Sequence, residues 1–453
     1  MRIDRRRLLM TGLFGTGLLA LRAAATGLPA WFLADPRRAR ADDMACALTA
    51  KDKLQSLIVC ASSAGDPISC NVPGTYDAPA IIHPSQDEFA ATAFSLGSTQ
   101  VTAAKVWSTL SPEILARTNF VHHITGGLVH GDHPKVMRLL GKTTGAEMAP
   151  SLYAKHLWKC LGTVQAEPVA LGASGALEFI SFSGRSLPTV TPTQLKELLT
   201  AAKNPVAKLR ALRDQSLDEL NAIFKQDGTP EQLKFLDALA SSQRQVRQLS
   251  ESLADTLAAI QDDKVSGQAL AAAALIAAKV TPVVTLHIPF GGDNHTDPDL
   301  YDEWFDHTDH GGEKRGVPGI QAVFDALSSL QLADSTTFAT MNVFGRDLSG
   351  TPKVDGRGGR DHFGNHSVMM MVGKNVQPGV SGGCTAISSA VYGASDIDST
   401  TGASKPSGGD IARADTHVAA AKTLGVALGI DVAALTADFL DNGRIPHVKG
   451  AIK

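Results

Sequence analysis

The chain has 453 residues, 43% of them hydrophobic and only 5% aromatic, and its formal net charge is −3. This length provides for one large buried core or two moderate ones, and the near-balanced charge gives no basis for binding nucleic acid or an anionic membrane surface. The few aromatic residues and the 42 glycines favour helices packed closely on a sheet over an all-β sandwich.

The N-terminal residues 1–41 predict a removable export signal. Paired arginines at positions 5–7 stand directly ahead of an apolar run over residues 8–21, which is too short to span a bilayer comfortably. Residues 39–41 (Ala-Arg-Ala) form a small-x-small cleavage site, which makes Asp42 the start of the mature chain. The paired arginines resemble a twin-arginine signal. We therefore expect a periplasmic or extracellular protein that is recognised by the twin-arginine export machinery and keeps no stable transmembrane segment after cleavage. An uncleaved N-terminal anchor is the alternative.

The cysteines indicate an oxidising compartment without fixing any disulfide. An odd number leaves at least one thiol unpaired, and the absence of Cys-x-x-Cys spacing argues against zinc bound by thiolates. A Cys46–Cys70 disulfide is one pairing that the spacing leaves open. The five residues are Cys46, Cys60, Cys70, Cys160 and Cys384.

Apolar strand-like segments alternate with helical ones along the mature chain, and this order predicts an α/β fold with a mostly parallel sheet. The predicted strands are residues 54–61, 119–124, 177–181, 282–288, 336–344 and 367–373. Helices are predicted at residues 101–110, 320–330 and 412–428, and a turn at residues 379–383. Residues 191–260, rich in Lys, Gln, Asp and Leu with one apolar face, predict a helical insert.

Three predicted strands are followed by an Asp and a His at the strand end, where open α/β sheets keep their chemistry. Carboxylate and imidazole ligands that arrive from different elements suit a divalent cation, and we expect zinc or calcium. Two such ions about 4 Å apart would hold both oxygens of a displaced phosphate or sulfate ester. The pairs are Asp132/His133, Asp293/His295 and Asp361/His362.

The remaining histidines have plainer interpretations. His307 and His310 stand among acidic residues, which is typical of a solvated surface. His122 and His123 are neighbours in one strand, so they point to opposite faces and at most one faces a site. His366 follows His362 by four positions and is a candidate additional ligand.

Several short motifs resemble the exported bacterial family called domain of unknown function 1501, which is placed in the alkaline phosphatase/sulfatase superfamily. They are the twin arginines, Asp293-Asn294-His295, Phe344-Gly345-Arg346, the Gly-Gly-Arg-Asp-His run at 358–362 and Asn442-Gly443-Arg444-Ile445-Pro446. The resemblance implies an alkaline-phosphatase-like three-layer sandwich over residues 42–453. It also implies metal binding at Asp293, His295, Asp361 and His362.

The sequence departs from the superfamily pattern near the first strand. No carboxylate follows that strand directly, and the nearest acid is Asp66. The candidate nucleophiles are Thr125 and, less well placed, Ser63, because the pair Asp132-His133 stands where family members carry a Ser-His pair. No Cys-x-Pro-x-Arg element exists, which excludes a formylglycine sulfatase.

The sequence thus predicts an exported, metal-dependent hydrolase of phosphate- or sulfate-type esters in small molecules, glycans or lipids. Asp293, His295, Asp361 and His362, with the Asp132/His133 pair, are the predicted metal ligands. Arg346 or Arg360 would offset oxyanion charge, and Thr125 or a metal-bound water would attack. The alternative is a non-catalytic cell-envelope binding or assembly protein on the same scaffold.

Overall fold

The fold is taken from a computed structural model. It describes residues 51–163, 165–172, 181–187, 189–200, 253–349, 359–388 and 391–453, with single positions at 219, 222, 223 and 226. The predicted export signal, Cys46 and most of the predicted strand at 177–181 lie outside the described residues. So does the centre of the predicted helical insert, whose described ends are the helices α6 (Pro192–Thr200) and α9 (Ala254–Ala259).

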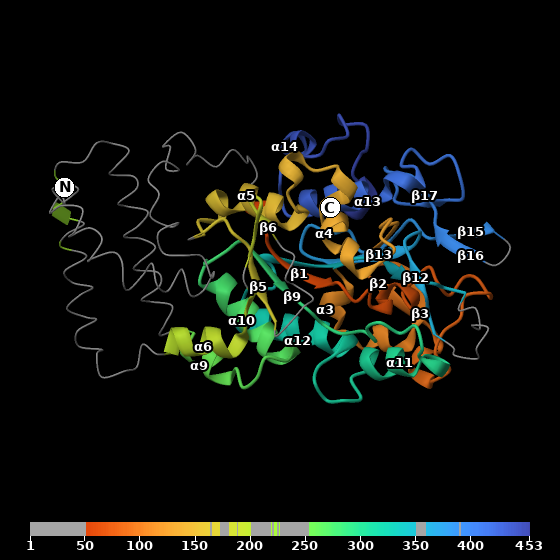
Figure 1. The fold of residues 1–453 in the computed structure, drawn as a ribbon, viewed down its shortest axis with the longest axis horizontal. Coiled ribbons are helices and arrows are strands. Elements are labelled where there is room, and N and C mark those ends of the chain that lie inside the picture. The colour runs from red at the N-terminus through yellow and green to blue at the C-terminus, as the bar shows by residue number, and fades with distance from the viewer. Residues whose placement is uncertain are drawn as a thin grey trace.

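Within the described residues, eight strands form one central sheet (Figure 1). All of them run in the same direction except β13, which is antiparallel to both of its neighbours. This arrangement confirms the predicted α/β fold with a mostly parallel sheet. In order across the sheet the strands are β14 (Gly379–Ser381), β4 (Thr118–His123), β13 (Ser367–Val372), β10 (Thr336–Asn342), β1 (Ser56–Ser62), β9 (Val283–Leu286), β5 (Val169–Leu171) and β8 (Thr189–Val190).

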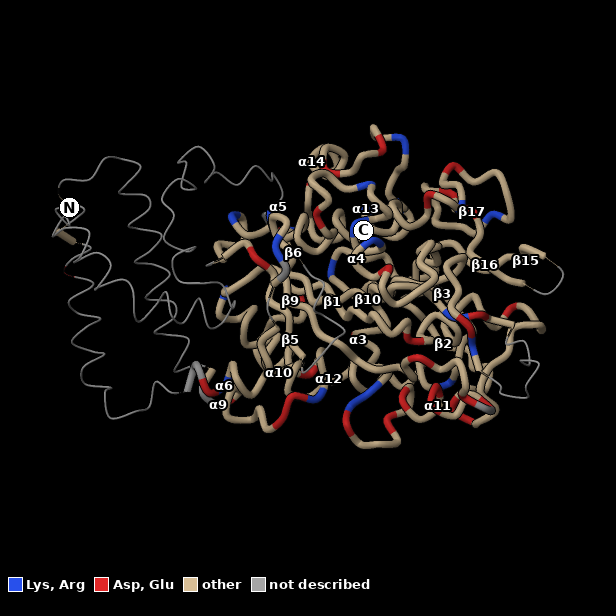
Figure 2. Tube along the Cα trace, viewed as in Figure 1, with Lys and Arg blue, Asp and Glu red and all other residues tan. Residues whose placement is uncertain are grey.

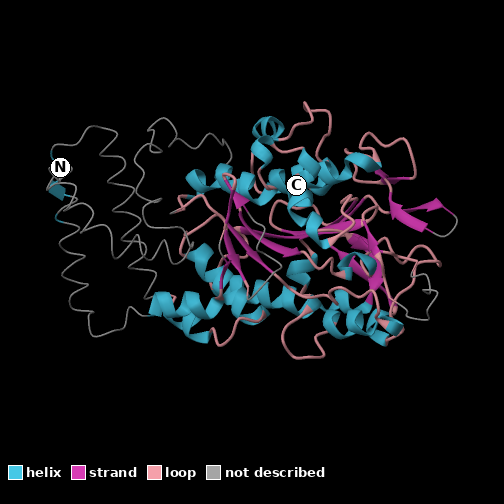
Figure 3. Cartoon of the chain, in the orientation of Figure 1, coloured by secondary structure: helices cyan, strands magenta, loops and turns pink. Residues whose placement is uncertain are grey.

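Helices cover both faces of the sheet and make three layers (Figure 3). Because successive side chains of a strand point to opposite faces, Ile58 and Cys60 of β1 join one core while Leu57, Val59 and Ala61 join the other. One layer contains α10 (Val265–Ala277) and α12 (Gly316–Ser329). The opposite layer contains α5 (Ala149–Leu161), α13 (Thr416–Ala427) and α14 (Val432–Asp438).

The alanine-rich helix α10 shows why this composition suits a layered fold. Most of its residues are buried, and it packs against both β9 and α12. Small side chains let a helix approach two neighbours closely, so the apolar surface is buried without bulky residues. Burial of this kind contributes roughly 25 cal/mol per Å² of apolar surface removed from water.

Two predicted elements are wrong. Residues 101–110 form the strand β3 (Thr99–Ala104) and a 3₁₀ turn instead of a helix; β3 pairs with β2 (Ala91–Leu96) in a hairpin of half-exposed, partly β-branched residues. Residues 379–383 contain the edge strand β14 instead of a turn, because pairing with β4 overrides the local preference of glycine. The smaller elements are α3 (Pro112–Leu115), α4 (His133–Met137), α11 (Tyr301–His307), β6 (Ser181–Phe182), β7 (Arg185–Ser186), β11 (Gly345–Arg346), β12 (His362–Phe363), β15 (Cys384–Ser388), β16 (Val391–Ala394), β17 (Asp396–Ile397) and β18 (Ser404–Lys405).

The strand directions bring several loops to one edge of the sheet. The carboxyl ends of β1 and β10 lie side by side, since Ser62 pairs with Asn342. The antiparallel strand β13 begins at the same edge, where Ser367 pairs with His123 at the end of β4. The segments that follow β1, β4, β9 and β10, and the one that precedes β13, therefore leave the sheet together.

The surface of the described residues is chemically mixed. Lys and Arg are interspersed with Asp and Glu along the described trace (Figure 2), in keeping with the formal net charge of −3. No described helix is both long and apolar enough to pass through a bilayer.

Candidate metal centre

Among the described residues, four side chains converge at this edge of the sheet: His130, Asp293, His295 and His362. His130 lies beyond the end of β4, and Asp293 and His295 lie beyond the end of β9. His362 begins β12, ahead of β13. One nitrogen or oxygen atom from each residue lies within 4.8 Å of the others.

The distances between these atoms suit one small cation. Asp293 Oδ2 lies 3.1 Å from His130 Nε2, and Asp293 Oδ1 lies 3.0 Å from His295 Nε2 and 3.5 Å from His362 Nε2. His295 Nε2 and His362 Nε2 are 2.7 Å apart. Ligands of a tetrahedral zinc ion stand about 3.3–3.6 Å from each other, as bond lengths of about 2.0–2.2 Å require. The three Nε2 atoms and the two carboxylate oxygens of Asp293 are therefore close to a coordination shell, at separations slightly shorter than such a shell has.

Each of the three imidazoles is held through its other ring nitrogen. His130 Nδ1 lies 2.7 Å from the carbonyl oxygen of Ser63, and His362 Nδ1 lies 2.8 Å from that of Leu128. His295 Nδ1 lies 3.1 Å from Asp361 Oδ1. A carbonyl or carboxylate oxygen can only accept, so each Nδ1 carries the hydrogen and each neutral ring presents its Nε2 lone pair. This is the usual outer-shell arrangement around metal-bound histidines.

The cluster consequently brings lone pairs face to face. The Nε2 atoms of His295 and His362 and the carboxylate of Asp293 are all acceptors once the Nδ1 hydrogens are placed. Acceptors about 3 Å apart repel unless a proton or a cation lies between them. A single divalent ion satisfies all four ligand atoms at once.

The centre is open on one side. The side chains of Asp293 and His130 are 45% and 41% exposed, whereas that of His362 is 17% exposed. Zinc sites with a catalytic role keep one coordination position for water or substrate, while structural sites are closed by four protein ligands. The four protein ligands here would fill a tetrahedral shell, so a water or substrate would bind as a fifth ligand on the exposed side.

Arg346 holds Asp293 of the centre in place from the buried side. Its guanidinium group is fully buried and donates to the carbonyl oxygens of Gly65, Ala64, Gly292 and Arg360 and to Asp293 Oδ1 at 2.9 Å. Burial alone would raise the pKa of Asp293, but the hydrogen bond and charge of Arg346 lower it below the usual range. With these acceptors engaged, Arg346 fixes a ligand and the loop after β1.

Asp66 is the nearest carboxylate after the first strand, and it has a structural role. It is buried, and its Oδ1 accepts hydrogen bonds from the peptide nitrogens of Phe290 and Gly292 at 2.8 and 2.9 Å. Ser62 Oγ donates to it as well, and His287 Nε2 lies 3.1 Å away. Asp66 thus holds the loop that carries Asp293, and it lies outside the cluster of four.

Asp361 and Arg360 occupy positions different from those expected. Asp361 orients His295 through Nδ1 and is not among the four clustered residues. Arg360 is fully buried in an ion pair with Glu303, with Nε 2.8 Å from Oε2, and also donates to the carbonyl oxygens of Asp347 and Ile82. These contacts make Arg360 a structural ion pair, and its guanidinium has no hydrogen bond in common with the cluster.

The acidic stretch 302–310 is only in part the solvated surface that was expected, since Asp302 and His310 are exposed but three other members are not. Glu303 and His307 are fully buried, and Asp306 is 9% exposed and pairs with Arg315 at 2.7 Å. Glu303 can be buried because the guanidinium of Arg360 supplies the opposite charge. Arg360 is remote in sequence, so the local pattern of acids and histidines could not predict this burial.

The third predicted Asp-His pair and the predicted nucleophile lie outside the cluster. Asp132 Oδ2 accepts from the peptide nitrogen of Leu128 at 3.0 Å and so closes the turn that presents His130. His133 is fully buried, and this burial lowers its pKa to about 4. Thr125 is also fully buried, and its peptide nitrogen donates to Gly364.

Sequence reasoning did not select His130, although it stands in the loop after β4. The signal was available: His130 lies two residues before Asp132 and beyond a buried strand, as His295 lies two residues after Asp293. Adjacency of Asp and His drew attention to His133, whose direction of approach is set by the first turn of α4 and cannot be seen in a linear pattern.

The strand histidines divide as predicted between the two faces. His122 contacts His366 and Cys384, while His123 stacks on His417 at a ring distance of 5.2 Å. His366 therefore belongs to a different group from His362 and is not a further ligand of the four-residue centre.

The state of the cysteines excludes the one disulfide that the sequence had left open. Cys60, Cys70 and Cys384 are free thiols, so the Cys46–Cys70 disulfide is wrong. Cys160 is disulfide-bonded, and its partner lies outside the described residues.

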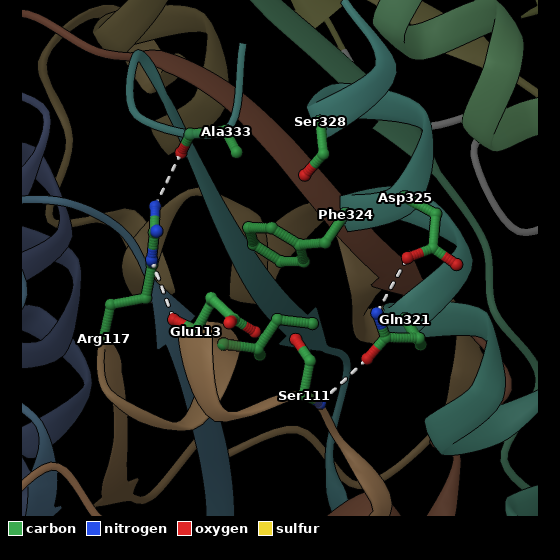
Figure 4. Close-up of a pocket in the computed structure, with 9 residues that line it drawn as sticks. Ser111, Glu113, Arg117, Gln321, Phe324, Asp325, Ser328 and Ala333 are labelled. Atoms are coloured by element: carbon green, nitrogen blue, oxygen red, sulfur yellow. Dashed lines mark hydrogen bonds between the residues drawn. The ribbon is translucent and has the colours of Figure 1, made fainter. Parts of the chain in front are cut away.

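A surface pocket at the opposite edge of the sheet offers less chemistry (Figure 4). Its polar groups pair with each other: Gln321 accepts from the Ser111 peptide nitrogen at 2.9 Å and donates to Asp325 at 2.8 Å, and Arg117 donates to the carbonyl oxygen of Ala333. The full lining is Ser111, Glu113, Ile114, Arg117, Gln321, Phe324, Asp325, Ser328 and Ala333.

The fold and the centre together define an α/β protein with a strand-end cluster of metal-ligand type. The family model described as "Protein of unknown function (DUF1501)" matches residues 184–442, more than half of the chain, and the chain belongs to this family. No curated protein and no solved structure matches the chain. Asp293, His295 and His362 lie within the matched range, whereas His130 precedes it.

Proposed function

We propose that the chain is a metal-dependent hydrolase whose centre is formed by His130, Asp293, His295 and His362. The observation that carries the proposal is the set of three imidazoles, each fixed through Nδ1 to an acceptor, whose Nε2 atoms meet a carboxylate on the exposed side of the sheet edge. In a purely structural hydrogen-bond network, three lone pairs that face one another would have no donor between them.

The ligand set favours zinc or a related transition metal over calcium. Three imidazole nitrogens and one carboxylate are borderline ligands that suit zinc in tetrahedral geometry. Calcium takes six to eight oxygen ligands, and the cluster supplies one carboxylate only.

Such a centre would act on an anionic ester. The two carboxylates of Asp293 and Asp361 and the guanidinium of Arg346 leave a local charge of minus one, which a divalent cation converts to plus one. A positively charged open site attracts a phosphate or sulfate group, polarises its oxygen and lowers the pKa of a bound water towards about 7. A water held by the metal would be a better nucleophile than Thr125, because the threonine side chain is fully buried.

We also propose a superfamily and a cellular location for the protein. A three-layer sandwich with Asp-x-His and Asp-His elements at strand ends supports placement among alkaline-phosphatase-like hydrolases, with Asp361 moved to the outer shell. The paired arginines at positions 5–7 and the disulfide of Cys160 support export by the twin-arginine machinery into an oxidising compartment.

The test combines metal content with an ester panel. Purified mature protein is stripped, reloaded with zinc, manganese or calcium, and assayed on phosphomonoesters, phosphodiesters and sulfate esters. Turnover that disappears together with the metal in His295→Ala, but persists in the matched control His310→Ala, supports the hydrolase. His310 is part-exposed and lies outside the cluster.

Two other results would contradict the hydrolase. Stoichiometric metal without turnover of any ester indicates the non-catalytic envelope protein, and the absence of metal binding contradicts both the centre and the hydrolase.

A further inference from the structure

A second group of ligand-type side chains lies apart from the four-residue centre. His122 of β4, His366 just ahead of β13, and Cys384 at the start of β15 approach one another at the edge of the sheet. His122 and His366 are fully buried, while Cys384 is partly buried. None of the three contributes to the hydrolase proposed above.

The three ligand atoms form a nearly regular triangle. His122 Nδ1 lies 3.0 Å from His366 Nε2, and Cys384 Sγ lies 3.3 Å from His366 Nε2 and 3.8 Å from His122 Nδ1. The point equidistant from the three is about 2.0 Å from each, as the three sides determine. Metal–imidazole bonds are about 2.0 Å long and metal–thiolate bonds about 2.3 Å. A metal near the centre of the triangle reaches all three atoms without movement of the backbone.

The surroundings fix how these atoms are presented. His122 Nε2 lies 2.8 Å from the carbonyl oxygen of Pro73 and must donate to it, so Nδ1 carries the lone pair that faces the triangle. The chain can cross His122 this closely only because residue 74 is glycine, since a Cβ there would come within 2.8 Å of Nε2. The outer shell that orients a metal-bound histidine is therefore already in place.

Hydrogen bonding inside the group is incomplete. His366 Nδ1 is buried and has no hydrogen-bond partner among the described residues. With the His122 hydrogen committed to Pro73, the triangle contains at most the thiol hydrogen and one imidazole hydrogen, so at least one of its three sides has no hydrogen bond. Burial lowers the pKa of His122 to about 4 and holds the pKa of His366 well below its usual value, so both rings are neutral at pH 7.

The charge balance selects among metals. The thiol side of the group adjoins the apolar residues Ile81, Leu348 and Tyr392. Two neutral imidazoles and one thiolate neutralise a monovalent cation completely, whereas zinc would leave one uncompensated charge in this buried setting. Thiolate is a soft ligand that selects copper(I), and trigonal coordination by two histidines and one cysteine is a copper geometry.

We propose that His122, His366 and Cys384 form a buried copper(I) site, distinct from the open centre. Binding replaces the thiol hydrogen of Cys384 by the metal: the S–H bond breaks, the S–Cu bond forms, and one proton leaves to solvent. The electron count of copper is unchanged. Residues 386–388 of the hairpin of β15 and β16, which follow Cys384 closely in sequence, are exposed.

The test is titration of stripped, full-length mature protein with copper(I) against a coloured copper(I) chelator under anaerobic conditions. The wild type takes up one equivalent, and X-ray absorption shows two nitrogen neighbours and one sulfur neighbour. Cys384→Ser and His122→Gln each weaken binding by about 100-fold or more, beyond the 10–100-fold that outer-shell changes cost.

Two control variants show whether copper is held by these three residues and not by another thiol or by the open centre. Cys60→Ser removes another buried free thiol, and His362→Ala removes a ligand of the open centre; both keep the copper equivalent. Circular dichroism of each metal-free variant establishes that it is folded. The proposal is overturned by copper uptake that persists in folded Cys384→Ser, by uptake that is lost in Cys60→Ser, or by a wild type that binds zinc here more tightly than copper(I).

Discussion

The buried ion pair of Arg360 and Glu303 makes a sharp prediction about stability. Both side chains are 0% exposed, and Arg360 Nε lies 2.8 Å from Glu303 Oε2. The substitution Glu303→Gln keeps the shape of the side chain and removes its charge, which leaves the guanidinium buried without an opposite charge. Removing one partner of a buried pair costs about 3–5 kcal/mol.

The size of the effect can be expressed as a melting temperature. At about 2.1 cal/mol/K per residue, the roughly 330 described residues give an unfolding entropy of about 0.7 kcal/mol/K, so Glu303→Gln lowers Tm by about 4–7 °C. The matched control is Asp87→Asn, which breaks a pair with Lys105 whose side chains are 78% and 50% exposed. Exposed pairs contribute little to stability because water and salt screen them, so the control leaves Tm nearly unchanged.

The assay is thermal unfolding followed by circular dichroism and calorimetry, with both variants metal-free. Because Arg360 also binds the carbonyl oxygens of Ile82 and Asp347, loss of the pair loosens the segment that leads to His362. The reasoning is refuted if Glu303→Gln and Asp87→Asn shift Tm equally.

Three further outcomes are expected. Asp361→Asn raises the Kd for zinc by about 10–100-fold, measured by competition with a chelator, because the residue fixes the Nδ1 hydrogen of His295. Zinc at 100 times its Kd raises the stability of the protein by about 2.7 kcal/mol, and chelation removes this increment. Asp66→Asn destabilises by about 1–3 kcal/mol at pH 7, since the amide nitrogen that replaces Oδ2 cannot accept the bonds from Ser62 Oγ and His287 Nε2. Burial alone would raise the pKa of Asp66, but its hydrogen bonds and the charge of His287 hold that pKa well below its usual value. The contribution of the carboxylate is therefore complete above about pH 4, the unfolded pKa, and declines as the pH falls further, so the difference between wild type and variant narrows in acid.

The sheet was largely predictable because buried parallel strands are short apolar runs that stand out locally. Residues 336–344 and 367–373 were recognised as strands for this reason, and β10 and β13 occupy most of them. The edge strand β14 was missed because Gly379 gives no apolar signal and its pairing with β4 joins segments that are remote in sequence.

The centre was predictable in part. Asp293, His295 and His362 were identified from residue type and position after a strand, since strand direction brings such residues to one edge. Whether Asp361 ligates the ion or orients His295 depends on side-chain direction, which spacing does not contain. The choice of His130 over His133 depends on the same kind of information.

The most direct test of the account is zinc binding to wild type and His130→Ala, measured by competition titration and X-ray absorption, with His310→Ala as the control. The centre predicts one zinc in the wild type and the control, with nitrogen and oxygen neighbours at about 2.0–2.2 Å, and a loss of affinity of about 100-fold or more in His130→Ala. Equal zinc affinity in all three proteins would contradict the centre.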